Sequence, residues 1–165
     1  MLVKRIKILA YLMLLLLFAC SGNKQRLLGG FEKLQWGSDI PTVKQYLEKD
    51  INAEYDYYEM ESATGKLKLR FKGSEFQSLP VSNWIFEIFK GGLTGYEITV
   101  SDSLNIPKDF QKLIDYYKEK LGKPTSLTDT KGFWKVRSDE KNYSEKISVR
   151  KFNDGLIIKV EKVNG

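Results

Sequence analysis

The stretch Lys66-Leu-Lys-Leu-Arg-Phe-Lys72 alternates strictly between basic and apolar side chains, and it decides the fold class of this chain. Successive side chains of an extended strand point to opposite faces, so Leu67, Leu69 and Phe71 share one face. One apolar and one charged face are typical of an antiparallel strand that is buried on one side only. The apolar face of such a sheet needs a covering layer, usually of helices.

Six other segments also have the pattern of strands, on the basis of alternation, aromatic content or flanking turn residues. They are 54–61, 82–90, 93–100, 132–137, 145–152 and 156–162. The pair Gly91-Gly92 predicts a hairpin between two of them, and Asn153-Asp154-Gly155 predicts another. The sequence therefore predicts an antiparallel sheet of about seven strands.

Two helices are predicted beside this sheet. Ser38 or Asp39 can cap the first, with Pro41 in its first turn, where a missing N–H is harmless. The second helix spans 107–121, carries one apolar stripe and stops before Gly122. The expected fold class is α+β, with two helices packed on the sheet.

A repeated dipeptide suggests a possible duplication. Both helices open with Ile-Pro, at Ile40-Pro41 and at Ile106-Pro107, and a run of hairpin-connected strands follows each. The order of elements therefore fits a duplicated helix-plus-meander unit, a possibility that this short match leaves open.

The first twenty residues have the layout of an export signal. Lys4, Arg5 and Lys7 precede an uncharged apolar run over 8–18. That run fits a secretory signal, whose apolar region has about 7–15 residues. A membrane-spanning helix needs about 20 such residues, so a transmembrane anchor is the weaker interpretation.

The end of this run, Leu17-Phe18-Ala19-Cys20, resembles the lipobox of bacterial lipoproteins; Phe18 departs from the usual small or aliphatic residue. The resemblance implies a diacylglyceryl group on Cys20, cleavage before it and acylation, such as by palmitate, of the new amino group. The chain then divides into a signal peptide (1–19), a lipidated tether (20–30) and a single α+β domain (31–165). The expected location is the cell envelope, and Ser21 after the cysteine favours an outer membrane.

The composition excludes several kinds of chemistry. The chain has no histidine, and Cys20 is its only cysteine, so His-based catalytic groups and His/Cys zinc sites are not expected. The net charge of +6 falls to about +3 when the signal segment is left out. The sequence contains no block of five like charges, so nucleic-acid binding is not expected. Glu59 and Glu61 could form an acid/base pair, but a solvated strand is the simpler interpretation. We therefore expect no enzyme, cofactor or metal site.

Two features are candidate binding surfaces. The tyrosines Tyr55, Tyr57 and Tyr58 could stack on a ligand or anchor a partner, or could pack in the core. The basic residues of the opening strand could meet anionic lipid headgroups, or could be an ordinary solvated face. These basic residues are Lys66, Lys68, Arg70 and Lys72.

The remainder of the chain is similar to small envelope lipoproteins. The resemblance rests on Trp36-Gly37 before a helix, on Leu121-Gly122-Lys123-Pro124 after one, and on the following Trp134. The order of elements is similar to small bacterial lipoproteins of unassigned function and to the BamE-like type. It implies a non-enzymatic module that is anchored in the membrane and binds or assembles another envelope protein. A lipoprotein that binds a small ligand or glycan through the tyrosine-rich strand is the alternative.

Overall fold

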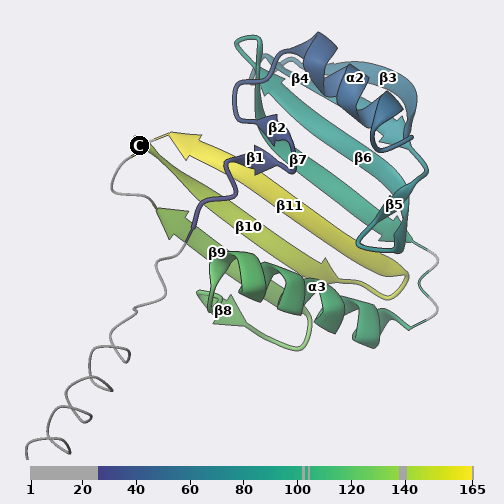
Figure 1. Ribbon diagram of the computed structural model, residues 1–165, viewed down its shortest axis with the longest axis vertical. Helices are drawn as coiled ribbons and strands as arrows, with labels where there is room; N and C mark the ends of the chain where they lie inside the picture. The colour runs from purple at the N-terminus through teal and green to yellow at the C-terminus, as the bar shows by residue number, and fades with distance from the viewer. Residues whose placement is uncertain (1–25, 102, 104, 138–140, 165) are drawn as a thin grey trace, which may run out of the picture.

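The computed structural model describes residues 26–101, 103, 105–137 and 141–164 (Figure 1). In this part of the chain the helices are α2 (Ile40–Lys49) and α3 (Ile106–Leu121). The long strands are β3 (Glu54–Glu61), β4 (Lys66–Lys72), β6 (Leu79–Phe89), β7 (Gly92–Ser101), β9 (Lys131–Arg137), β10 (Tyr143–Lys151) and β11 (Gly155–Asn164). The two-residue strands are β1 (Gly30–Phe31), β2 (Leu34–Gln35), β5 (Glu75–Phe76) and β8 (Ser126–Leu127).

The main sheet is antiparallel and has nine strands within the described residues, so the expected count of about seven is wrong. All seven expected segments are strands, and the additional members are β5 and β8. Each of these spans only two residues, which is too short to show the alternation from which strands are predicted. The α+β class itself is confirmed.

The sheet consists of two meanders that meet at their last strands. Its order is β3-β4-β6-β7-β11-β10-β9-β8, so the first meander runs inward to β7 and the second runs inward to β11. These two central strands pair antiparallel, with Ile98 directly opposite Ile158. A helix precedes each meander, α2 the first and α3 the second, so the order of elements in the two halves is the same.

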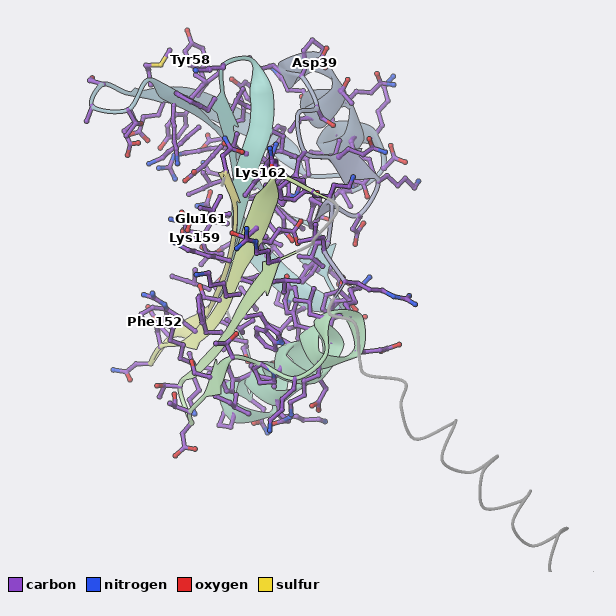
Figure 2. All side chains as sticks on the ribbon, turned by 90° about the vertical axis from the view of Figure 1, so that its left-hand side faces the viewer. Asp39, Tyr58, Phe152, Lys159, Glu161 and Lys162 are labelled. Carbon is purple, nitrogen blue, oxygen red and sulfur yellow. The ribbon has the colours of Figure 1, made fainter. Side chains whose placement is uncertain are left out.

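Both helices cover the same face of the sheet and leave the other face open (Figures 1 and 2). Each helix begins at an expected kind of cap: the Asp39 side chain accepts a hydrogen bond from the Thr42 amide at 2.9 Å, and Asn105 accepts one from the Lys108 amide at 3.2 Å. The helices bury the apolar stripes expected from sequence, such as Val43 and Leu47 on α2. At Gly132, a Cβ atom would lie 2.3 Å from Ile114 Cδ1, so α3 packs very closely on β9.

The N-terminal hairpin of β1 and β2 occupies the gap between the helices (Figure 1). Phe31 is buried there among five aromatic rings, with the closest centroid, that of Tyr96, at 4.9 Å. Leu27 and Leu28 pack against the same core. Leu27 is thus the first of the described residues to contribute a side chain to the core.

Candidate functional site

A buried carboxylate holds the N-terminal segment to the sheet. Glu145, on β10, is fully buried. It accepts hydrogen bonds from the backbone amide of Leu28 at 2.6 Å, from that of Gly29 at 2.8 Å, and from the indole of Trp36 at 2.6 Å. Burial of a carboxylate is tolerated when several donors satisfy it. We call Glu145 and its three donors the N-terminal clamp.

The sequence contains a signal for this clamp, although Glu145 is not among the residues predicted from it. Glu145 alternates with Ile147 and Val149, whose side chains are in the core, and this spacing places its carboxylate on the helix-covered face. A charged side chain at an apolar position of a strand has to find partners inside the protein. The identity of the partners could not be predicted, because Leu28 lies 117 residues away in sequence.

A polar hollow opens beside the clamp. It has a volume of about 400 Å³, and Trp36, Tyr143, Lys141 and Lys162 are among its lining residues. Burial, and secondarily the charge of Glu145, raises the pKa of Tyr143 above its ordinary value. The Lys162 ammonium lies 5.0 Å from the centroid of the Tyr143 ring, and the hollow is lined by three lysines and one carboxylate, that of Glu32.

The three candidate tyrosines lie on two faces of β3. Tyr55 and Tyr58 are opposite Phe71 and Leu69 on the helix side, whereas Tyr57 is opposite Arg70 on the open face. Tyr55 packs on Phe71, with a centroid distance of 5.3 Å. Tyr57 and Tyr58 are 48% and 65% exposed. The three rings therefore do not converge on one site, and this arrangement does not favour the glycan-binding alternative.

The candidate basic residues of β4 are each paired with a carboxylate. The pairs are Lys66–Glu87 at 2.9 Å, Lys68–Glu61 at 3.2 Å, Arg70–Glu59 at 3.0 Å and Lys72–Asp56 at 2.9 Å. The hydrogen bond to Asp56 raises the pKa of Lys72, and those from Thr64 and Lys68 lower the pKa of Glu61. Glu59 and Glu61 are thus partners of β4, and their surroundings do not favour the role of an acid/base pair.

The predicted signal peptide (1–19) and the acylated Cys20 lie outside the described residues. Within the described residues, neither helix has the length and hydropathy needed to cross a membrane. In the same part of the chain, no three His, Cys, Asp or Glu side chains gather as a metal site would require.

Comparisons of this chain with protein-family models, with curated proteins and with solved structures gave no match. The resemblance to bacterial lipoproteins and the expected envelope location therefore stay predictions.

Proposed function

We propose that this chain is a lipid-anchored envelope protein that is not an enzyme and that binds another envelope protein along the outer edge of β3. The observation that carries this proposal is that β3 is an eight-residue edge strand with exposed aromatic and apolar side chains. Tyr57, Tyr58 and Met60 are 48%, 65% and 59% exposed.

An edge strand has backbone N–H and C=O groups that no neighbouring strand uses. An extended segment of a partner can pair with these groups and place alternate side chains against the exposed ones. Tyrosine suits such a contact because it supplies a large rigid surface at little entropic cost. At the opposite edge of the sheet, β8 has only two residues, so β3 is the longer template.

Two features limit the pairing to one stretch of β3. The register shifts between Tyr55 and Tyr57, which leaves Asp56 as the extra residue of a β-bulge. Beyond the bulge, Glu59 and Glu61 keep the strand charged on its open face. The stretch from Tyr57 to Glu61 is therefore the expected contact, with a partner segment that brings apolar side chains to Tyr58 and Met60.

We also infer that the two halves derive from one duplicated helix-plus-meander unit. The matching order of elements and the pairing of β7 with β11 support this inference. The two edge strands, β3 and β8, then correspond in position, and only β3 in the first half is long.

Site-specific photo-crosslinking in the native host tests the contact. A photoreactive phenylalanine at Tyr58 or Met60 should crosslink one defined protein, which should be lost when Tyr57→Asp is added. The control position is Phe152, an equally aromatic surface residue at the far end of the sheet, 46% exposed (Figure 2). The same product from Phe152, or no product from either β3 position, would rule out the proposed contact.

The anchor is tested separately by intact-mass measurement and membrane fractionation. The wild-type chain should carry the mass of its acyl groups and sediment with membranes, whereas Cys20→Ala should carry none. A wild-type chain of unmodified mass in the soluble fraction would contradict the anchor and leave the crosslinking result standing.

A further inference from the structure

Two pairs of like charges face each other across β9 and β10. Lys131 is directly opposite Arg150, and Lys135 is directly opposite Lys146. These four residues alternate with side chains such as Trp134 and therefore lie on the face that the helices leave open. We call Lys131, Lys135, Lys146 and Arg150 the β9–β10 cationic patch.

No ion pair among the described residues neutralises this patch. None of its four residues has an ion pair with a residue that the structure describes, unlike the four basic residues of β4. Glu161 of β11 is directly opposite Lys146 of β10, but its carboxylate is bound by the Lys159 ammonium at 3.0 Å. Figure 2 shows Lys159 and Glu161 together on the side of the sheet that faces away from the helices.

The arrangement is costly for the fold. Like charges directly opposite each other in an antiparallel pair are destabilising, whereas opposite charges in the same place are stabilising. The β3–β4 pair follows the stabilising rule, with Glu59 opposite Lys68 and Glu61 opposite Lys66. The β9–β10 patch breaks this rule twice, and among its four residues only Lys146 has a carboxylate of the described residues, that of Glu161, directly opposite it on its other side. This arrangement points to a role outside the protein.

We infer that the β9–β10 cationic patch binds the anionic headgroups of a phospholipid bilayer. The two like-charged pairs are four residues apart along the strands, or about 14 Å, so a single phosphate cannot meet both. A surface that carries many headgroups can. Phe133 lies between the two pairs, on the same face, where an aromatic ring can enter the polar interface of a bilayer.

The position of the N-terminal clamp favours a membrane over an acidic protein. Glu145, which holds Leu28 and Gly29, is adjacent to Lys146 in β10. The residues that follow the predicted anchor are therefore fixed to the strand that carries half of the patch, with Leu28 and Gly29 held on its helix-covered face and Lys146 on its open face. The choice of a membrane rests to this extent on the proposed anchor.

Vesicle co-sedimentation tests the inference. The probe is phosphatidylcholine vesicles, with or without about a third of phosphatidylglycerol, and the protein is residues 21–165 without acyl groups. We expect binding to the anionic vesicles only, and weaker binding at high salt. Lys135→Glu should lower the affinity at least about fivefold.

Lys135→Glu also separates this role from a structural one. The new carboxylate would face Lys146, so the variant should unfold at a higher urea concentration than the wild type while binding vesicles less well. Lys112→Glu, an exposed residue of α3 on the opposite side of the molecule, is the control with the same change of charge.

Three results would overturn the inference. They are no wild-type binding to anionic vesicles at low salt, equal binding to neutral vesicles, and an equal loss with Lys112→Glu. None of them would bear on the crosslinking at β3 or on the mass of the anchor, because the assay uses neither.

Discussion

Glu145 is a polar residue whose substitution the structure predicts to be strongly destabilising. Glu145→Ala would leave three buried donors without their acceptor: the amides of Leu28 and Gly29 and the indole of Trp36. We expect the free energy of unfolding to fall by about 2–4 kcal/mol in urea titrations. Hydrogen exchange at the Leu28 and Gly29 amides should accelerate, since the carboxylate is what binds them.

The matched control for this prediction is Glu161→Ala, on the open face of the neighbouring strand. The Glu161 carboxylate pairs with Lys159 at a partly exposed site. Exposed ion pairs contribute about 0–1 kcal/mol, so Glu161→Ala should lower the free energy of unfolding by less than about 1 kcal/mol. Equal losses for the two variants, or unchanged amide exchange in Glu145→Ala, would contradict the clamp.

Asp39 predicts a dependence of stability on pH. The hydrogen bonds that its carboxylate accepts from the Thr42 side chain and amide lower its pKa below 3.8. A group with a lowered folded-state pKa contributes stability above its unfolded pKa, and this contribution is lost as the pH falls through the folded value. Between about pH 5 and pH 2, the urea midpoint of the wild type should therefore fall more than that of Asp39→Asn, which caps without titrating. Parallel curves for the two proteins would contradict this account.

At the scale of elements, the contact between α3 and β9 depends on a glycine. A methyl group at Gly132 would lie 2.3 Å from Ile114 Cδ1, so Gly132→Ala should destabilise the protein by about 1–3 kcal/mol. Ile114→Ala creates space at the same point. The free energy of unfolding of the double variant should therefore fall by less than the two single losses added together, and the difference should be at least about 0.5 kcal/mol. Additive effects in a double-mutant cycle would show that the helix is not held at this contact.

The elements themselves could largely be predicted from local patterns. Strand β4 and helix α3 were predicted within a residue of their bounds, because each has a strong period and clear end signals. The pairing of β7 with β11 could not be predicted, since nothing local specifies which distant strands meet.

The candidate surfaces likewise combine features that local sequence predicts with contacts between distant segments that it does not predict. The register of the β3–β4 hairpin, with Glu61 opposite Lys66, places opposite charges side by side and could have been predicted by aligning the two strands. The actual partners could not, because Glu61 pairs diagonally with Lys68 and Lys66 pairs with Glu87 on β6. The like charges of β9 and β10 could have been found in the same way. By contrast, the half-buried Trp36 meets Glu145, a contact between segments 109 residues apart that no local pattern predicts.

At the scale of the whole molecule, the two halves should unfold together. Ile98 and Ile158 are both fully buried and directly opposite each other at the junction of the meanders. Ile158→Ala should cost about 2–5 kcal/mol and should still give one transition. In a Trp36→Phe background, fluorescence of Trp84 in the first half and of Trp134 in the second, each observed with the other also changed to Phe, should report the same midpoint. Two separate midpoints would mean that the halves are independent units.

The N-terminal clamp also has a mechanical consequence. Force applied to the chain before Leu28 would load the Glu145 carboxylate first and then β10, which lies between β9 and β11. The load would thus enter an interior strand, whose hydrogen bonds on both sides share it, and would not peel an edge strand away one bond at a time. A domain held at this point can bear a pulling force on its N-terminal tether without losing the hydrogen bonds of its sheet one after another.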